Sequence, residues 1–569
     1  MQQELVKIVP PGGSAFEITK GAIASINPQN CVNCGKCREM CPVGAITEQQ
    51  RIICRLCPSC TSKPALTHAD MVSLATEKSC TTECPLGISP QGYVNLTRAG
   101  KEIEAYRHIW DKNPLPSICG RICHHPCEQA CKRGILVDEP IAIRGIKRYL
   151  TDNIDYVPGP YPKIYEETIA VIGAGPAGLA AGHTLALAGY TVTLFDGESK
   201  AGGMLNRGIP AFRLPRDVTE REIGKLVDAG LTIQLGERIG KAQAEALVKD
   251  YDAVIVAAGA PNARELPIKG CRKEGIFTAL QFMERVNAGQ DIWRHPGQEF
   301  TRGGEVVVIG GGNVAIDSAR TAVRLGAKKV TVLCLESGAD VPCHEWERRE
   351  AEDEGIELLE GWAPQQFTGL HNVLQGVEFF KVSKFSKESD GKISFETDAA
   401  QSRIIPADMV IVAIGQKADD LWKIFEGKEK LFYAGDVRSN AYSVIDAMAS
   451  GKEAAARADR FLRGRAEKDP LELRQLNEAP LEQKIYPAVR LKIDRPPLPV
   501  AAAAERIHSF DEVETEYAPE VIETEVLRCL QCGYQRVDAE KCIGCGVCKA
   551  VCPKGDSITM VQVGKGGAA

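Results

Sequence analysis

Residues 168–196 follow a pattern that few folds accommodate: a short apolar strand, a glycine-rich turn, a helix and a second strand that ends in an acid. In the turn, Gly173 allows a tight reversal, Gly175 lets a pyrophosphate approach the backbone, and Gly178 lets the helix pack closely. The second strand, "YTVTLFD", ends at Asp196, whose carboxylate can accept hydrogen bonds from a ribose hydroxyl. This order predicts a Rossmann-like unit that binds a dinucleotide.

The pattern recurs in "EVVVIGGGNVAIDSARTAVRLGAKKVTVLCLE" (305–336), with Gly310, Gly312 and Ala315 in the turn and Glu336 at the end of the next strand. Two such units predict an α/β protein with two bound dinucleotides. The segments 252–260 and 408–416 are read as buried strands, and 431–455 as a strand, a Gly435–Asp436 turn and a helix. No Cys-x2-Cys or Cys-x4-Cys pair follows either glycine turn, which argues against a disulfide reductase.

The order of these segments, with "GGMLNRGIPAFRLP" (202–215), resembles the small subunit of glutamate synthase. It is also similar to relatives in NADH-dependent reduced ferredoxin:NADP oxidoreductase and to the front domains of dihydropyrimidine dehydrogenase. The resemblance implies FAD on the first unit and a nicotinamide nucleotide on the second, which is inserted into the FAD domain. The FAD contacts expected from motif and resemblance are Gly173, Ala174, Gly175, Pro176, Ala177, Gly178, Asp196, Gly203, Met204, Gly435, Asp436, Ser443 and Val444. Those expected for the nicotinamide nucleotide are Gly310, Gly312, Asn313, Ala315 and Glu336.

The acid at the end of the second unit bears on which nucleotide binds. Family members that use NADP typically carry two arginines where this chain has Leu335 and Glu336. A carboxylate there bonds the 2′-hydroxyl of NAD and repels a 2′-phosphate. A like-charge pair at about 4 Å costs up to about 4 kcal/mol at an effective dielectric near 20. Half of that exceeds a tenfold preference. We therefore expect NAD(H) and regard NADP as less favoured; the alternatives are that Arg348 or Arg349 reaches a phosphate, or that Glu336 is a solvated loop acid.

Composition limits the class of protein. The chain has 569 residues, of which 44% are hydrophobic and 25% charged, as in soluble globular proteins. Its net charge of −6 gives no reason to expect nucleic acid or an anionic membrane as a partner. The uncharged run 169–195 is long enough to span a bilayer, but its glycines and prolines favour strand–turn–helix–strand instead of membrane insertion. The N-terminus lacks a signal-peptide pattern, so a cytoplasmic location with reduced thiols is expected.

The 22 cysteines are grouped, with thirteen between residues 31 and 131 and six between 529 and 552. "CVNCGKCREMCP" is a Cys-x2-Cys-x2-Cys-x3-Cys-Pro run of Cys31, Cys34, Cys37 and Cys41, typical of a [4Fe-4S] cluster and less typical of zinc. A second such run near the C-terminus has Cys542, Cys545, Cys548 and Cys552, and it is preceded by Cys529 and Cys532. Because six cysteines fall short of two cubes, that end either takes outside ligands for a second cluster or uses Cys529 and Cys532 for a smaller or shared site.

The cysteines between the first run and the first glycine turn are harder to group. They are Cys54, Cys57, Cys60, Cys80, Cys84, Cys119, Cys123, Cys127 and Cys131. The resemblance implies two clusters here, but the first Cys-x2-Cys of the family pattern is missing before Cys80. Cys57 and Cys60 are expected to supply it, giving a set with Cys80 and Cys131.

The other family cluster matches Cys84, Cys123 and Cys127, and the position of its fourth ligand matches Lys147, a poor ligand. Cys119 matches a position expected to be non-ligating. Across the whole chain we expect three to five [4Fe-4S] clusters.

The expected division is as follows: 1–70, an N-terminal ferredoxin-like segment; 71–165, a helical iron–sulfur domain; 166–295 and 413–465, the two parts of the FAD domain; 296–412, the NAD(P) domain; 466–520, a polar, Pro/Ala-rich linker; and 521–569, a C-terminal ferredoxin-like domain.

These parts together predict an NADH-linked flavin and iron–sulfur oxidoreductase subunit, because flavin accepts two electrons and releases them singly. No residue is expected to act as a general acid or base. The expected partners are other oxidoreductase subunits or a ferredoxin. The alternatives are an electron-bifurcating flavin subunit, a glutamate synthase small subunit proper, and a non-catalytic electron wire or scaffold.

Overall fold

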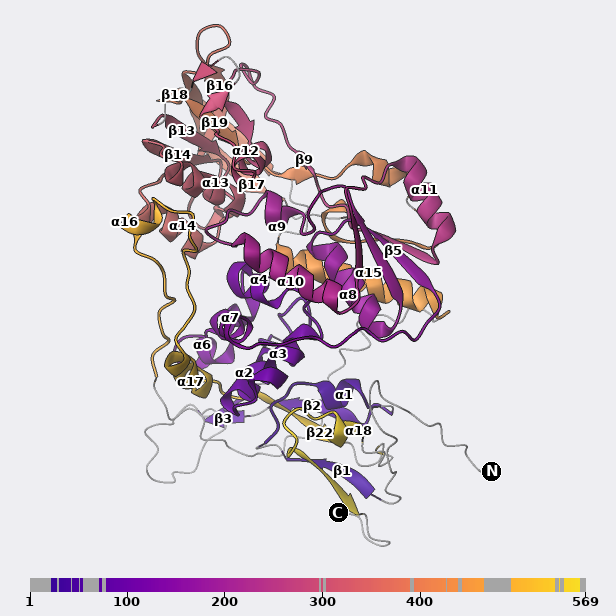
Figure 1. The fold of residues 1–569 in the computed structure, drawn as a ribbon. Helices are drawn as coiled ribbons and strands as arrows, with labels where there is room; N and C mark the ends of the chain where they lie inside the picture. Colours follow the sequence, from indigo (N-terminus) through magenta and orange to yellow (C-terminus); the bar gives the residue numbers. More distant parts are fainter. Residues whose placement is uncertain are drawn as a thin grey trace.

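The computed structural model describes residues 22–27, 30–41, 43–50, 52–54, 71–73, 78–295, 298–299, 303–388, 393–425, 427–438, 443–464, 493–537, 542 and 547–562. Cys57, Cys60 and Cys545, and the side chain of Cys54, lie outside this set. Among the described helices, none combines the length and apolar character that crossing a bilayer requires. Figure 1 shows two sheet-containing units above a layer of short helices, with the strands of residues 22–50 and 533–562 below that layer.

The first glycine unit is a parallel sheet in the order β21-β8-β5-β6-β7. Its strands are β5 (Thr168–Ile172), β6 (Thr191–Asp196), β7 (Thr232–Leu235), β8 (Ala253–Val256) and β21 (Leu431–Tyr433). The covering helices are α8 (Pro176–Ala188), α10 (Arg216–Asp228), α11 (Lys241–Asp250) and α15 (Val444–Leu462), with the short α9 (Met204–Arg207) and the 3-10 turns η3 (Asp420–Phe425) and η4 (Gly435–Val437) between them. Helix α15 crosses α8 closely because Gly451 has no side chain; a Cβ there would lie 2.0 Å from the carbonyl oxygen of Ala177.

The second glycine unit has the parallel order β10-β19-β13-β14-β15. Its strands are β10 (Ile276–Thr278), β13 (Glu305–Ile309), β14 (Lys329–Cys334), β15 (Glu357–Glu360) and β19 (Met409–Val412). The helices are α12 (Ala279–Asn287), α13 (Asn313–Arg324) and α14 (Glu345–Asp353), with the 3-10 turn η2 (Gly338–Asp340). An antiparallel sheet of β16 (Trp362–Thr368), β17 (Gly376–Lys387) and β18 (Ile393–Pro406) extends this unit, and β11 (Arg294–His295) and β12 (Gln298–Glu299) form a small hairpin.

The expected boundary at residues 295/296 is wrong. Strand β10 pairs in parallel with β19, so residues 276–295 belong to the second unit. The chain passes between the units through β9 (Asn262–Ala263) and β20 (Gln416–Lys417), which pair with each other. The error arose because β10 is only three residues long and carries no glycine signal.

The helical layer comprises α2 (Pro90–Arg98), α3 (Glu102–Trp110), α4 (Pro116–Ile122), α5 (Pro126–Gln129), α6 (Lys132–Leu136) and α7 (Ile143–Asn153). Its apolar core continues into the first sheet, joining Ile118 and Leu150 with Val171 and Leu179. Helices α4 and α7 touch at Gly120, where a Cβ would lie 2.9 Å from the Cα of Arg148. The layer is therefore fixed to the first unit and cannot move independently without exposing this core.

The two ends of the chain form one unit, which corrects the expectation of two separate ferredoxin-like segments. Strand β1 (Ala22–Ile26) pairs antiparallel with β23 (Ile558–Gln562), and β2 (Ile46–Gln50) pairs antiparallel with β22 (Gly533–Val537). Helices α1 (Lys36–Glu39) and α18 (Val547–Ala550) complete this two-ended unit, and β3 (Ile52–Cys54) and β4 (Met71–Ser73) form a separate hairpin. A two-stranded hairpin from either end alone would be marginal in water, which favours the shared arrangement.

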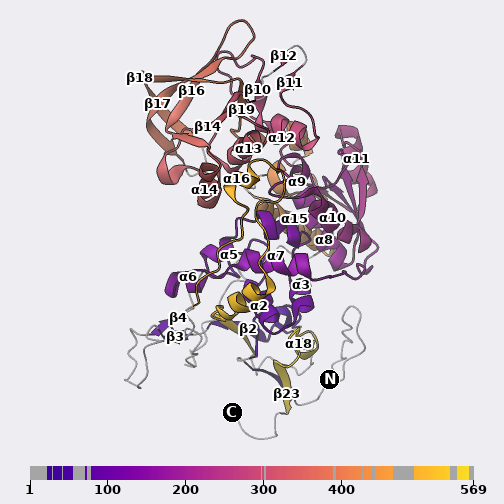
Figure 2. The same cartoon turned by 60° about the vertical axis from the view of Figure 1, so that its left-hand side comes forward.

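Of the linker expected over 466–520, residues 466–492 lie outside the described set. The described part, together with residues 521–528, forms an arm with buried anchors. Figures 1 and 2 show it running from α16 (Ala503–Arg506), beside α14, down to α17 (Pro519–Leu527) at the helical layer. Arg506 reaches the buried Glu354, which directly follows α14, at 2.8 Å. Tyr517, 3% exposed, packs over Gly145 of α7. The arm thus ties the second glycine unit to the helical layer and to the C-terminal cysteines.

Candidate functional site

A cavity of about 860 Å³ lies at the carboxyl ends of β5 and β6. Of the residues predicted to contact FAD, those lining it are Gly173, Gly175, Pro176, Ala177, Asp196, Gly203, Met204, Gly435, Asp436, Ser443 and Val444. The other two, Ala174 and Gly178, shape the turn: the amide of Ala174 donates to the carboxylate of Asp196 at 2.6 Å, and Gly178 packs against Gly173. The structure therefore brings predicted FAD contacts from positions 173 to 444 together around one cavity.

The glycines of the turn fit a dinucleotide at this cavity. A Cβ on Gly178 would lie 1.9 Å from the carbonyl oxygen of Gly173, so this glycine is needed for packing. A Cβ on Gly175 would meet nothing closer than the Cα of Gly203, at 3.9 Å. Gly175 thus leaves open space at the N-terminus of α8, where amide groups and the helix dipole favour a phosphate.

A second cavity of about 510 Å³ lies at the carboxyl ends of β13 and β19, and Gly312 and Asn313 line it. Gly310, at φ +132°, turns beneath it against Ala413, and Ala315 is buried in α13. The two cavities share lining residues, which are His124, Ala260, Ala279, Leu280, Asn313, Val314, His344, Gln416, Asp436 and Ser443. A two-electron donor in one cavity can therefore meet an acceptor in the other.

Glu336 does not line either cavity; it is half-buried two residues beyond the end of β14. Its carbonyl oxygen accepts from the amide of Gly361 at 2.9 Å. A second acid, Glu360, ends the neighbouring β15 and pairs with Arg348 at 2.6 Å. Arg349 pairs with Glu345 at 3.1 Å, so both arginines of the sequence alternative already have carboxylate partners.

Aromatic rings fill the junction between the helical layer and the second glycine unit. His124 and His344 stack with ring centroids 5.7 Å apart, and His344 stacks on Trp346 at 4.4 Å. All three line the larger cavity. Burial, with the nearby His124 and His125, lowers the pKa of His344 to about 4, so this ring is neutral near pH 7. Sequence reasoning missed these residues; the available signal was that His124 directly follows Cys123, a predicted metal ligand.

Four thiols surround Lys147 beside the larger cavity. Burial lowers the pKa of the Lys147 ammonium, but Cys123, Cys119, Cys127 and Cys84 more than offset it, so its pKa is raised. Lys147 is 6% exposed and lies on α7, which packs against α4, the helix that carries Cys119 and is directly followed by Cys123. Cys123 also lines the larger cavity. The predicted trio therefore lies together, and Cys119, expected to be non-ligating, lies with it.

A different set of four thiols lines a small cavity between the helical layer and the end of the arm: Cys80, Cys131, Cys529 and Cys532. The prediction joined Cys80 and Cys131 to Cys57 and Cys60, which lie outside the described residues. The structure places the C-terminal Cys529 and Cys532 beside Cys80 and Cys131.

The remaining described cysteines gather in the two-ended unit. Cys31, Cys34 and Cys37 line one small cavity together with Cys552 from the other end of the chain. Cys41 packs with Cys542 and Cys548 in one apolar cluster. Each Cys-x2-Cys-x2-Cys-x3-Cys run thus directs its last cysteine toward the other run, as in proteins where the fourth cysteine ligates a neighbouring cluster.

The donor chemistry fits iron–sulfur clusters better than single ions. Among the described residues, no three histidine, cysteine or acidic side chains are close enough to hold one metal ion. A [4Fe-4S] cube takes one thiolate at each iron, so its ligands surround a volume and not a point. The thiols also receive donors typical of such sites, such as the amide of Gln535 to Cys31 and that of His125 to Cys123, both at 3.4 Å.

Family models match these parts of the chain. The model described as pyridine nucleotide-disulphide oxidoreductase matches residues 167–447. The model for dihydropyrimidine dehydrogenase domain II, 4Fe-4S cluster, matches 50–156, and the 4Fe-4S binding domain matches 24–47 and 536–555. With the site described above, they define an NAD(P)H-dependent flavoprotein oxidoreductase that carries iron–sulfur clusters.

Three relatives narrow the class. The small chain of glutamate synthase [NADPH] from Azospirillum brasilense is 30% identical over 68% of this chain and 87% of that protein. The beta subunit of NADP(+)-dependent formate dehydrogenase from Moorella thermoacetica is 32% identical over 80% of this chain and 70% of that protein. The NAD-dependent dihydropyrimidine dehydrogenase subunit PreT from Escherichia coli O157:H7 is 30% identical over 73% of this chain and 98% of that protein. The chain belongs to the family of the glutamate synthase small subunit.

Proposed function

We propose that the chain passes electrons between NAD(H) and protein-bound iron–sulfur clusters through FAD, as one subunit of a larger oxidoreductase. The observation that carries the proposal is the continuity of the two cavities, with Cys123 in the wall of the larger one. A nicotinamide in the smaller cavity can face a flavin in the larger, and the flavin can face a cluster. Flavin supplies the exchange between two-electron and one-electron carriers.

FAD is assigned to the larger cavity because Gly175 leaves room for its pyrophosphate and Asp196 stands at the end of β6 for its ribose. The other end of the cavity is closed by the N-terminus of α15, where Ser443 accepts from the amide of Asp446 at 3.3 Å. Residues at the carboxyl ends of β5 and β6 and at the start of α15 therefore line the cavity in which FAD is assigned.

NAD(H) is preferred over NADP because Glu336 lies two residues beyond the end of β14 and Glu360 ends β15, near where the adenine ribose of the second nucleotide is expected. Arg348 is already held by Glu360 and Glu352, at 2.6 and 3.0 Å. A 2′-phosphate would meet these acids with no free guanidinium supplied by that arginine. The relatives' names point both ways, since two are named for NADPH or NADP(+) and one for NAD.

Anaerobic reduction of the flavin by NADH and by NADPH tests this assignment. We expect the wild-type chain to favour NADH by more than tenfold in kcat/KM, since even half of a 4 kcal/mol repulsion gives that ratio. Glu336→Arg should reverse the preference. Glu345→Arg, at the exposed start of α14, serves as the control for a charge change on the same unit. Equal or better reduction by NADPH in the wild type would refute the role of Glu336.

A cluster beside the flavin is assigned to Cys84, Cys123 and Cys127, with Cys119 as fourth ligand. Cys119 and Cys123 stand one helical turn apart at the end of α4, and Lys147 faces them from α7. An ammonium has no lone pair to offer a metal, whereas a buried cation favours the anionic cluster. Lys147 is thus assigned as a charge partner of the cluster and not as its ligand.

Substitution of Cys119 separates these roles. In Cys119→Ser we expect about four fewer iron atoms per chain, or conversion of one cluster to a three-iron form, because one of four thiolates is lost. Lys147→Met should keep the iron and lower the midpoint potential of one cluster, since the reduced cluster carries more negative charge. Iron analysis and potentiometric EPR read both effects, with the exposed Cys271→Ser as control. Unchanged iron and spectra in Cys119→Ser would remove Cys119 from the ligand set.

One route from the flavin favours simple electron transfer over bifurcation. Among the described residues, Cys123 is the cysteine that lines the larger cavity. Bifurcation requires two separate one-electron exits from one flavin.

The relatives named above are subunits of multi-subunit enzymes, which supports other subunits as partners; a ferredoxin is the second candidate. Either would dock at the two-ended unit, far from the flavin-side sheet in Figure 1.

A further inference from the structure

We propose that Cys80, Cys131, Cys529 and Cys532 hold one [4Fe-4S] cluster, so that the end of the arm completes a metal site on the helical layer. This inference deepens the electron route of the proposed function and rests on it for its role, although the site itself stands on geometry. It replaces Cys57 and Cys60 with a pair of cysteines more than 390 positions further along the chain than Cys131.

The four thiols line one small cavity whose other walls include both apolar and charged side chains. Those walls include Val94 of α2 and Ile141 and Ile143 at the start of α7. Cys131 is 8% exposed, and its three partners are half-buried. Four thiols around a space shielded from water are the ligand set of a [4Fe-4S] cube. Zinc would need the four sulfurs to converge on one point, and no such convergence exists among the described residues.

The segment that carries Cys529 and Cys532 is clamped on both sides by bonds that do not involve the thiols. Before the pair, the carbonyl oxygen of Arg528 accepts from Arg133 at 2.7 Å. After it, Gln91 of α2 bonds both the carbonyl oxygen and the amide of Gly533, at 2.7 and 3.0 Å. These hydrogen bonds on both sides of the pair hold Cys529 and Cys532 against Cys80 and Cys131 without help from the thiols.

Arg528 anchors the segment from inside. Its side chain is fully buried, and its Nε donates to the carbonyl oxygen of Ile493 at 2.8 Å. Its guanidinium also bonds the buried carboxylate of Glu525 at 2.9 Å and the carbonyl oxygen of Glu139 at 2.9 Å. A buried guanidinium with this many partners is costly to displace, which fixes the start of the Cys-x2-Cys pair.

The surroundings suit an anionic cluster. Lys132, 4% exposed, and Arg133, 1% exposed, line the same cavity as the four thiols. The side-chain amide of Asn95 donates to the sulfur of Cys529 at 3.5 Å. Glu48 also lines the cavity, but its carboxylate is paired with Arg38 at 3.0 Å. Arg133 is itself paired with Asp138 at 2.6 Å. The Lys132 ammonium and the amide donor are therefore the groups that lower the cost of placing four thiolates together.

The position gives the site a place in the electron route. Cys80 lies four residues before Cys84, and Cys131 four residues after Cys127, so each is a near neighbour of a ligand assigned to the flavin-side cluster. On the other side, α2 carries Gln91 to Gly533, and the next residue, Gly92, packs against Cys34 of the two-ended unit. The site therefore lies between the cluster assigned beside the flavin and the two-ended unit.

The test uses the full-length chain, purified anaerobically with its clusters. Cys532→Asp is compared with Cys60→Asp by iron and sulfide content and by EPR of the oxidised and reduced protein. Because one thiolate of four is replaced, we expect Cys532→Asp to convert or remove one cluster, a loss of one to about four iron atoms per chain. Cys60→Asp should leave that cluster signal unchanged.

The double substitution Cys529→Ser with Cys532→Ser should remove the whole cluster, about four iron atoms, while flavin content and flavin reduction by NADH persist. Cluster loss in Cys60→Asp together with an intact spectrum in Cys532→Asp would overturn the proposal. Flavin reduction on the same samples reports separately on the proposed function. If the double variant does not fold, Cys532→Asp still tests the proposal, because it keeps three of the four thiolates.

Discussion

Replacing Gly175 by valine is expected to give a folded protein without flavin. The Cβ would meet no atom of the protein closer than 3.9 Å, so the Cβ of the new side chain causes no clash within the protein. The side chain would instead occupy the space in which a pyrophosphate approaches the N-terminus of α8. Loss of those backbone contacts should weaken flavin binding at least a hundredfold, about 2.8 kcal/mol.

Flavin content, from the absorbance of released cofactor, and the thermal transition of the apoprotein measure the two effects separately. The control is Gly224→Val, because a Cβ at Gly224 of α10 also meets nothing within 4 Å and this residue does not line the cavity. Gly178→Ala should behave differently and unfold the turn, because its Cβ would clash with Gly173. Full flavin content in Gly175→Val would show that the pyrophosphate lies elsewhere.

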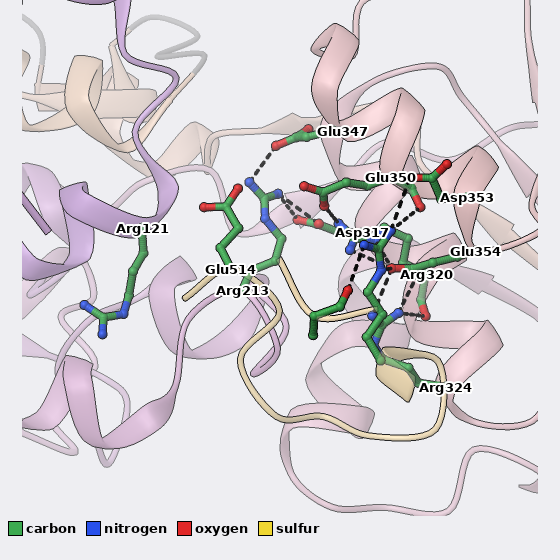
Figure 3. A network of polar contacts seen from close by, with 12 residues as sticks. Arg121, Arg213, Asp317, Arg320, Arg324, Glu347, Glu350, Asp353, Glu354 and Glu514 are labelled. Atoms are coloured by element: carbon green, nitrogen blue, oxygen red, sulfur yellow. Dashed lines mark hydrogen bonds and ion pairs between the residues drawn. The ribbon is translucent and has the colours of Figure 1, made fainter. Parts of the chain in front are cut away.

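The second large effect is expected in Glu354→Gln, which removes the charge at the centre of a buried network (Figure 3). The side chain of Glu354 is fully buried, and its carboxylate bonds Arg320, Arg324 and Arg506 at 2.7, 2.6 and 2.8 Å. Removing one partner of a buried ion pair costs about 3–5 kcal/mol because the remaining charges lose their compensation. We expect the second glycine unit to lose stability by that amount and the arm to lose its contact with α14.

Denaturant unfolding followed at Trp293 and Trp346, both in the second unit, and protease sensitivity near α16 measure these changes. Glu345→Gln is the matched control: it lies on the same helix and pairs with Arg349 at the surface, where a pair contributes about 0–1 kcal/mol. Equal stabilities of the two variants would contradict a structural role for the buried network.

The effect of Glu354 should depend on pH. Burial raises the pKa of this carboxyl, but hydrogen bonds from Arg324 and Arg320 outweigh burial and lower it to about 2. A depressed pKa contributes stability that is present above the unfolded value, near 4.5, and is lost as pH falls through about 2. The difference between wild type and Glu354→Gln should therefore shrink between pH 4.5 and pH 2. A constant difference across that range would contradict this assignment.

The dinucleotide motifs were readable from sequence because they are local. The turn at Gly173 to Gly178 is set by positive φ and close contacts within a few residues, and the strands on either side are continuous apolar runs. The same locality explains why Cys31, Cys34 and Cys37 could be grouped. Short elements without such signals, such as β10, were assigned to the wrong unit. His124 gave only the indirect signal of following Cys123, and His344 gave none, because stacking between distant segments leaves no mark in either of them.

The sequence by itself indicated the candidate binding residues: two glycine turns, an acid at or just beyond the end of each second strand, and cysteines at cluster spacing. The tertiary structure decided which cysteines meet. Cys552 joins Cys31, and Cys529 joins Cys80, although each pair is separated by more than 440 residues. Spacing can fix only ligands that lie within a turn or two of each other. The rest of a cube's ligands depend on strand pairing between the chain ends and on the buried anchors of the arm, which are long-range contacts that no local pattern records.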